Sequence, residues 1–243
     1  MKIAEIFYSI QGEGSLVGAP SVFVRTSGCN LRCSWCDTPY TSWRPEGEEL
    51  SLDEIVTRVA EYSAPYVVLT GGEPMIAPGV GELTRLLRDG GAHLTIETAG
   101  TVFQEVACDL MSISPKLSNS TPEGVFRAQH ERLRFQPEVL RRFMAGYDYQ
   151  LKFVIAEPGD MEEVKMVLDG VKADPRKVIL MPEGRDAATL QARGVWLAEI
   201  CKSEGYRLSP RLHVDLLGYL RGVYVRESEI MPRRRQGNRG SSY

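Results

Sequence analysis

The sequence lacks any long uninterrupted apolar segment. No apolar run approaches the roughly 20 residues that a membrane-spanning helix needs, so no membrane partner is expected. The first residues, MKIAEIFYSIQGEG, include an acidic residue and have neither a long apolar core nor a small-residue cleavage site. They therefore do not match a secretory signal, and we expect a cytoplasmic protein.

A strong excess of charge of one sign is also missing. The formal net charge is -3 and charged residues make up 25% of the chain, which gives no general attraction to nucleic acid. The stretch at 225–243 contains five arginines, and such a composition is typical of a solvated tail. We therefore expect one domain over residues 1–223, followed by a flexible extension over residues 224–243.

The chain also lacks a fourth cysteine near its cysteine cluster. Five cysteines are an odd number, and three of them, Cys29, Cys33 and Cys36, are crowded together, which argues against a disulfide framework. A structural zinc site needs four ligands, but the next cysteine is Cys108 and no histidine lies close in the sequence. A four-iron cluster held by three thiolates leaves one iron open for another molecule. The cluster of cysteines therefore indicates metal or redox chemistry.

Past residue 50, short β-branched runs alternate with segments of helical period, which predicts βα units and a parallel sheet. Ser51 and Glu54 have capping-box spacing at the start of one helix, and Asp160 with Glu163 repeats that spacing at another. We expect strands at 22–28, 66–70, 93–98, 109–115, 150–155, 177–182 and 211–215, helices at 51–62, 80–89, 136–145, 187–204 and after Asp160, and a long loop at 115–135. Six or seven strands are too few to close a barrel of about eight, so we predict an α/β fold with a partial (open) β/α barrel.

The candidate functional residues follow the expected strands. In sheets of this kind, ligands bind at the carboxyl ends of the strands, where loops and helix N-termini converge. Four glycine-, cysteine- or lysine-bearing loops fall there: GCNLRCSWC (28–36), GGEP (71–74), ETAGT (97–101) and SPK (114–116). Gly71 and Gly72 suit the close approach of a ligand, which leaves no room for a Cβ. We therefore expect a single ligand-binding mouth.

The cysteine spacing, with Trp35 directly before Cys36 and GGEP beyond the next strand, resembles the radical S-adenosylmethionine superfamily. Within it, IQGEG (10–14), the block VFVRTSGCNLRCSWCDT (22–38), TGGEP, ETAGT and SPK together resemble the 7-carboxy-7-deazaguanine synthase family of queuosine and deazapurine biosynthesis. The resemblance implies a partial barrel of the radical SAM type, a carbon-nitrogen lyase activity, a homodimer, and an electron donor such as flavodoxin or ferredoxin.

The resemblance also implies roles for individual residues around the cofactor. Cys29, Cys33 and Cys36 would hold a [4Fe-4S] cluster, whose fourth iron binds S-adenosylmethionine and cleaves it to methionine and a 5'-deoxyadenosyl radical. The residues that would contact S-adenosylmethionine are Trp35, Cys36, Asp37, Gly72, Ser114, Pro115 and Lys116. No catalytic residue is assigned beyond the cluster and the cofactor.

The substrate implied by the resemblance is 6-carboxy-5,6,7,8-tetrahydropterin. The residues that would bind it are Ile10, Gln11, Gly12, Glu13, Arg25 and Thr70, with Arg25 as the cation for the carboxylate. Thr38 resembles the family's magnesium-binding hydroxyl. Taken alone, Arg25 fits a surface salt bridge and Thr38 an ordinary helix cap. For Glu97 two orientations stay open, toward the mouth or toward an arginine in the barrel wall.

Two alternative functions are considered. A glycyl-radical enzyme activating enzyme shares the cysteine spacing and a GGEP-like loop but acts on a partner protein, and IQGEG and CDT (36–38) count against it. A non-catalytic thiolate-metal binding module would contain zinc without iron or sulfide. The convergence of glycine-rich and cysteine-rich loops on one mouth counts against the module.

Overall fold

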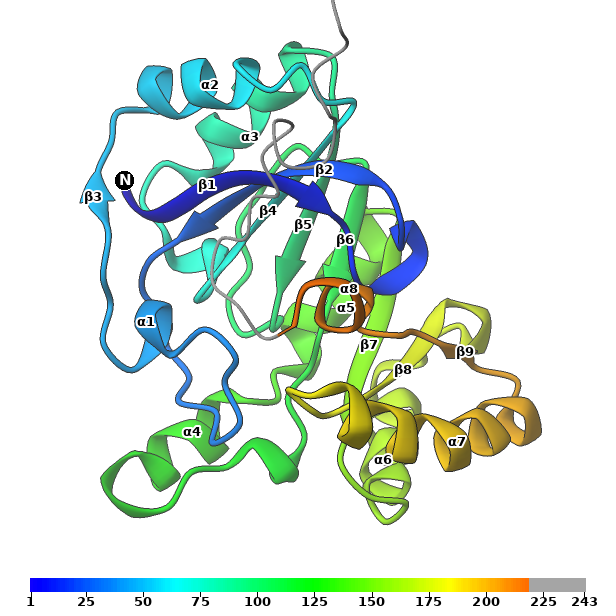
Figure 1. Cartoon of the computed structure of the whole chain (residues 1–243). Helices are drawn as coiled ribbons and strands as arrows, with labels where there is room; N and C mark the ends of the chain where they lie inside the picture. The colour runs from blue at the N-terminus through cyan, green and yellow to red at the C-terminus, as the bar shows by residue number, and fades with distance from the viewer. Residues whose placement is uncertain (219–243) are drawn as a thin grey trace, which may run out of the picture.

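The computed structural model describes residues 1–218. The expected domain boundary at 223 and the expected extension at 224–243 lie outside the described residues. Within those residues, nine strands form one sheet in the order β3-β1-β2-β4-β5-β6-β7-β8-β9 (Figure 1). The strands are β1 (Lys2–Ile10), β2 (Pro20–Thr26), β3 (Glu48–Glu49), β4 (Tyr66–Gly71), β5 (His93–Thr98), β6 (Leu110–Ile113), β7 (Tyr149–Ile155), β8 (Val178–Pro182) and β9 (Arg207–Leu208).

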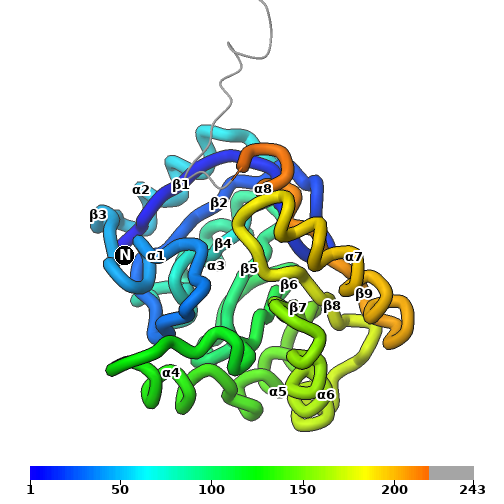
Figure 2. The backbone as a smooth tube through the Cα atoms, turned by 60° about the horizontal axis from the view of Figure 1, so that its bottom comes forward, coloured from blue at the N-terminus to red at the C-terminus, as the bar shows by residue number. Residues whose placement is uncertain are grey.

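The sheet is open, as predicted from the small number of strong strand segments. Strands β2 and β4 to β9 pair in parallel, whereas β1 is antiparallel to both β2 and β3. The short strands β3 and β9 form the two edges, and in Figure 2 the strands follow an arc from one to the other. The partial β/α barrel is therefore confirmed.

Helices follow most of the parallel strands. They are α1 (Pro39–Ser42), α2 (Leu52–Ala60), α3 (Val80–Asp89), α4 (Arg127–Leu133), α5 (Pro137–Gly146), α6 (Asp160–Val171), α7 (Ala187–Glu204) and α8 (Leu212–Leu217). The capping box expected at α2 is present, because Glu54 N donates to Ser51 Oγ at 3.2 Å and Ser51 N donates to Glu54 Oε2 at 2.8 Å. None of the helices in this part of the chain is long and apolar enough to cross a membrane.

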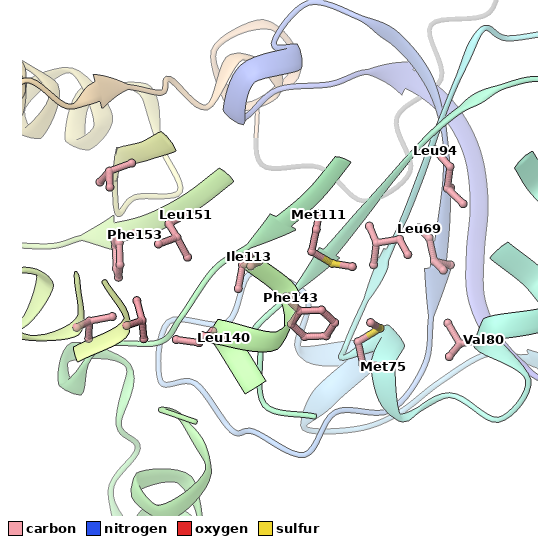
Figure 3. Close-up of a cluster of buried hydrophobic side chains, with 14 of the residues drawn as sticks. Leu69, Met75, Val80, Leu94, Met111, Ile113, Leu140, Phe143, Leu151 and Phe153 are labelled. Atoms are coloured by element: carbon pink, nitrogen blue, oxygen red, sulfur yellow. The ribbon is translucent and has the colours of Figure 1, made fainter. Parts of the chain in front are cut away.

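Period-two alternation in the parallel strands separates the hydrophobic core from a polar inner face. Side chains such as Leu69, Ile96, Met111 and Leu151 pack under the helices, as Figure 3 shows for the cluster around Phe143. Their neighbours in sequence point to the other face, because successive side chains of a strand alternate. The neighbours that line a cavity on that face are Thr70, Glu97, Ser112 and Lys152.

Two expectations from the sequence, a strand at 211–215 and a helix cap at Asp160, are wrong. Residues 211–215 were expected to be a strand, but α8 begins at Leu212, directly after Pro210 and Arg211. The backbone turns here because Leu212 N donates to Gly12 O at 3.0 Å and the Arg211 side chain is drawn into the interior. Asp160 is not a helix cap: Gly159 precedes α6, and the Asp160 carboxylate accepts from Ala156 N at 2.7 Å.

Several elements were not expected from the sequence. Strand β1 is half-exposed and antiparallel, so its residues show no continuous buried run, and β3 and β9 have only two residues each. The predicted number of six or seven strands is therefore too low. The expected long loop at 115–135 contains α4 and two 3-10 turns, Ser118–Ser120 and Gly124–Phe126.

Candidate active site

A cavity of about 490 Å³ opens at the carboxyl ends of the parallel strands. It is lined by residues of the IQGEG segment, the cysteine loop and the loops after β4, β5 and β6, which together form the mouth that the sequence predicts. The lining includes Ile10, Gln11, Gly12, Glu13, Arg25, Cys29, Cys33, Trp35, Cys36, Asp37, Thr38, Thr70, Gly72, Ser114 and Lys116. Of the residues assigned a role from the sequence, Pro115 alone is not in the lining of this cavity.

The cysteine loop places three free thiols against the cavity. Leu31, which is 1% exposed, anchors the loop in the protein interior, and its N–H donates to Cys29 Sγ at 3.4 Å. Burial raises the pKa of Cys29 and of Cys33 to about 12. Both thiols are therefore protonated in the metal-free protein, and metal binding must displace their protons.

The three thiols provide a set of soft donors for a metal cluster. Among residues 1–218, no group of three His, Cys, Asp or Glu side chains is close enough to hold one metal ion. The thiols nevertheless line one cavity, and Cys33 and Cys36 both add to the rise in the pKa of Cys29. Cysteine thiolates are the ligands that typically hold iron-sulfur clusters. The donor set therefore fits a [4Fe-4S] cluster.

Gly71, the last residue of β4, and Gly72, directly after it, lie close against the backbone of a neighbouring segment. A Cβ on Gly72 would lie 2.0 Å from Gly28 O, and one on Gly71 would lie 2.3 Å from Thr26 O. Both glycines also line the cavity, and the close approach of a ligand to them stays a prediction. Their physical role is to let the GGEP loop pack directly against the start of the cysteine loop.

Glu73 joins the GGEP loop to the ETAGT loop. Its carboxylate is buried and accepts from Thr98 Oγ1 at 2.7 Å, Ala99 N at 2.8 Å and Met75 N at 3.1 Å. Burial raises the pKa of Glu73 despite these hydrogen bonds. The side chain thus fixes two of the four loops around the mouth relative to each other.

A network of charged side chains, most of them buried, forms one wall of the cavity. The Glu13 carboxylate is paired with Lys152 from β7 and with Arg211 Nε at 3.1 Å, while Arg211 Nη2 donates to Asp37 Oδ2 at 2.5 Å. Burial alone would raise the pKa of Glu13, but the charges of Lys152 and Arg211 outweigh it and hold this pKa well below its usual range. Arg211 therefore connects the IQGEG segment to the CDT residues after the cysteines.

The structure decides the orientation of Glu97. Its carboxylate faces the cavity and accepts from Thr70 Oγ1 at 2.9 Å and from Gln11 Nε2 at 3.2 Å. Gln11 Oε1 in turn accepts from Glu13 N at 3.1 Å. Acidic, amide and hydroxyl groups from β4, β5 and the IQGEG segment thus form one continuous polar wall.

Arg25 and Thr38 both line the cavity and contact other polar side chains. Arg25 lines the cavity, and its Nε donates to Glu5 Oε1 at 2.7 Å, so it forms a salt bridge inside the site rather than on the surface. Thr38 precedes α1, but its side chain makes no capping hydrogen bond. Its hydroxyl instead accepts from Thr41 Oγ1 at 3.3 Å and lies 3.9 Å from Cys36 Sγ.

The loop after β6 carries a cation beside the aromatic residue of the cysteine loop. Lys116 Nζ lies 5.7 Å from the centre of the Trp35 ring and donates to Ser114 Oγ at 2.8 Å. A cation above an aromatic face is favourable. The pair therefore gives the cavity a positive group close to the cysteines.

Sequence reasoning missed several cavity residues, namely Glu5, Tyr40, Ser112, Lys152, Arg211 and His213. For Lys152 a signal existed, because a lysine inside the otherwise apolar strand segment QLKFVI requires a buried partner. Arg211 had no such signal, since it follows a proline in a polar stretch and reaches the cavity only through the turn before α8.

Comparisons with known proteins agree with this site. The radical SAM superfamily model matches residues 23–149. A 7-carboxy-7-deazaguanine synthase of Halobacterium salinarum is 45% identical over 89% of this chain and 90% of its own length, and one of Rhodopirellula baltica is 41% identical over 91% and 88%. The crystal structure of QueE from Escherichia coli superposes with a TM-score of 0.69 and 26% identity, covering 87% of this chain and 94% of that one.

The fold and the cysteine-lined cavity thus define a radical S-adenosylmethionine enzyme, whose family implies a [4Fe-4S] cluster and S-adenosylmethionine as cofactors. Within that superfamily, the chain belongs to the 7-carboxy-7-deazaguanine synthases. The resemblance found in the sequence is confirmed, and the readings as a glycyl-radical activating enzyme or a metal-binding module are not supported.

Proposed function

We propose that the chain catalyses the radical SAM-dependent ring contraction of 6-carboxy-5,6,7,8-tetrahydropterin to 7-carboxy-7-deazaguanine, with loss of ammonia. The observation that carries this proposal is the convergence of IQGEG, the cysteine loop, TGGEP, ETAGT and SPK on one cavity in a chain of this family. The enzyme is a carbon-nitrogen lyase, and its product enters the queuosine and deazapurine pathways that supply modified tRNA.

The cofactor end of the cavity is assigned to the cysteine loop. Cys29, Cys33 and Cys36 would hold the cluster, and the bound cluster and S-adenosylmethionine supply hydrogen-atom abstraction by one-electron chemistry. The chain positions the cofactor with Trp35, Asp37, Gly72, Ser114 and Lys116, all of which line the cavity. Lys116 supplies a cation for a carboxylate, and the buried walls keep water from the reacting atoms.

The substrate end is assigned to the polar wall. A pterin edge alternates hydrogen-bond donors and acceptors, and Gln11, Glu97 and Thr70 present amide, carboxylate and hydroxyl groups already aligned with one another. Arg25 provides a cation for the substrate carboxylate. The backbone of Ile10 and Gly12 and the carboxylate of Glu13 complete this wall.

A magnesium ion at Thr38 belongs to the same proposal. Mg²⁺ prefers oxygen ligands and usually keeps several waters, so one protein hydroxyl together with substrate oxygens is sufficient. Thr38 lines the cavity and its side chain makes no helix-capping hydrogen bond, which supports this role. We expect turnover to depend on Mg²⁺ while the metal-free protein keeps its fold.

The assembly and setting of the enzyme are also proposals. We propose a homodimer that receives electrons from a flavodoxin or a ferredoxin in the cytoplasm, without direct contact to nucleic acid or membrane. The five free cysteines suit a reducing compartment. A single catalytic domain over residues 1–223 is retained as the expected organisation.

The decisive experiment is anaerobic reconstitution of the cluster, followed by product analysis with carboxypterin, S-adenosylmethionine, a reductant and Mg²⁺. The proposal expects 7-carboxy-7-deazaguanine and ammonia in equal amounts from the chain alone. If 5'-deoxyadenosine formed only after addition of a partner protein, an activating enzyme would be indicated instead. Zinc without iron or sulfide in the purified protein would indicate a metal-binding module.

A further inference from the structure

The cysteine loop (residues 28–38) contains no strand or helix, so other parts of the chain must hold its backbone. Between Cys29 and Cys36, four groups of the loop donate to one segment, residues 117–130, and one of them is Ser34 Oγ, which donates to Asn119 O at 3.5 Å. Arg32 N donates to His130 Nδ1 at 3.1 Å, Ser34 N donates to Ser120 O at 2.9 Å, and Trp35 Nε1 donates to Asn119 O at 3.0 Å. The 117–130 segment, which includes most of the unexpected structure after β6, therefore lies directly against the loop (Figure 2).

Among these contacts, the one made by His130 depends on the tautomer of its imidazole ring. It is 1% exposed, and its Nε2 lies 2.9 Å from Ser120 Oγ. Ser120 Oγ donates its own proton to Leu117 O at 2.6 Å, so the imidazole Nε2 must donate to Ser120. Nδ1 is then left as an acceptor for the Arg32 amide. One neutral tautomer satisfies all of these groups.

The 117–130 segment is itself fixed to the barrel. Asn119 Nδ2 donates to Val154 O at 3.1 Å and to Asp160 Oδ2 at 2.8 Å, which ties the segment to β7 and α6. Glu163 of α6 accepts from Ser118 N at 2.8 Å and forms an ion pair with Arg134, just beyond α4. The hydrogen bond from His130 therefore connects the cysteine loop to the rigid part of the fold.

We propose that His130 is a positioning residue for the iron-sulfur site: it holds the Arg32 amide between Cys29 and Cys33, so that the thiols are presented to the cluster in a fixed arrangement. The proposal rests on the cluster-binding role assigned above to Cys29, Cys33 and Cys36. His130 does not touch the cluster or the substrate in this proposal. It acts through the backbone of the loop.

The first test is amide hydrogen exchange of the metal-free protein. His130→Phe keeps a ring of similar shape and removes the acceptor, so exchange in the peptide that contains residues 31–36 is expected to become roughly five-fold faster. His130→Asn places an amide oxygen near the position of Nδ1, so it is expected to restore slow exchange. His93→Phe is the matched control, because His93 Nδ1 has no hydrogen-bond partner among residues 1–218 and lies at the start of β5.

The second test is the retention of iron by the reconstituted protein. We expect a chelator to remove the visible cluster absorption of His130→Phe roughly five-fold faster than that of the unaltered chain. His130→Asn and His93→Phe are expected to lose this absorption at about the rate of the unaltered chain. Ser120→Ala is a milder second variant, because it removes the hydroxyl that fixes the imidazole tautomer but keeps the carbonyl that accepts from Ser34. Ser120→Ala is expected to accelerate both amide exchange in the loop and iron loss, and it serves as the test if His130→Phe does not fold.

Two outcomes would overturn the proposal. Unchanged exchange and unchanged iron loss in both His130→Phe and Ser120→Ala would show that the hydrogen bond does not hold the loop. If exchange and iron loss were accelerated equally in His130→Asn and His130→Phe, the packing of the His130 ring, rather than its hydrogen-bond acceptor, would hold the loop. The exchange test needs no metal, so it stands apart from the proposed function, which would fail if Cys33→Ala retained the cluster.

Discussion

Glu13 and Lys152 lie 139 residues apart in the chain and form a buried ion pair that lines the cavity. Their side chains are 14% and 7% exposed, so the pair is largely removed from water. A buried pair of this kind is costly to break, because removal of one partner leaves an uncompensated charge. The pair also fixes the IQGEG segment against β7, which places Gln11 beside Glu97.

Glu13→Gln is expected to lower the free energy of unfolding by about 3 kcal/mol near neutral pH. Because Lys152 and Arg211 hold the pKa of Glu13 below its ordinary value of 4.5 despite burial, the stabilisation is complete above that pH and is lost as the pH falls. Chemical denaturation near pH 7 and near pH 3.5 should therefore show a smaller difference between variant and parent at the lower pH. Glu123→Gln, at a carboxylate that is 91% exposed, serves as the control and should leave stability unchanged. A difference that stays constant with pH would contradict the ion-pair explanation.

Lys152→Met tests the same pair from its other side. The substitution alone should destabilise the protein, since it leaves the Glu13 carboxylate in a buried position with Arg211 as its remaining close cation. Combined with Glu13→Gln, it should cost less than the sum of the two single changes, with a coupling energy on the order of 1–3 kcal/mol. Additive single and double variants, measured by denaturation of all four proteins, would show that the two side chains do not interact.

Gly72→Ala is expected to destabilise the protein by about 2 kcal/mol, because the added Cβ would lie 2.0 Å from the carbonyl oxygen of Gly28. The matched control is Gly146→Ala at the end of α5, where a Cβ would meet no other atom of the described part of the chain within 4 Å. That control should be neutral or slightly stabilising. Thermal unfolding of the metal-free protein compares the two, and equal midpoints would exclude the steric explanation for this glycine.

Cys33→Ala is expected to abolish retention of the iron-sulfur cluster and cleavage of S-adenosylmethionine. Cys201→Ala provides the control, because Cys201 is buried in α7 and is not in the lining of the cavity. Iron and sulfide content after anaerobic reconstitution is the measurement. Full turnover by Cys33→Ala, or loss of iron in Cys201→Ala, would show that the ligands are wrongly assigned.

Arg25→Gln is expected to raise KM for carboxypterin roughly ten- to hundred-fold, since a charge-assisted hydrogen bond to the substrate carboxylate is lost. Iron content should not change. The control is Arg88→Gln, which removes the ion pair between Arg88 and Asp109. The Arg88 side chain is 45% exposed, so this change should leave KM unaltered. Steady-state kinetics decide the point, and a fall in iron content without any change in KM would assign Arg25 to the loop rather than to the substrate.

The three cysteines that line the cavity and the parallel strands could be predicted from the sequence because their signals are local. Cys29, Cys33 and Cys36 lie in one loop, and the β-branched runs that form β4 and β5 are continuous in the chain. The capping box of α2 is equally local. The error at 211–215 arose because short segments such as RLHVD satisfy strand and helix patterns alike, and the hydrogen bond to Gly12 O decides between them.

By itself, the sequence determined the family, the group of three cysteines that lines the cavity and the open barrel, since each depends on residue types at fixed short spacings. The tertiary structure alone decided which charged side chains enter the cavity. Lys152 and Arg211 reach Glu13 from positions 139 and 198 residues away, and Glu97 turns toward Gln11 across 86 residues. The physical reason is that a buried charge needs its partner within hydrogen-bond distance, and chain folding rather than spacing supplies that partner.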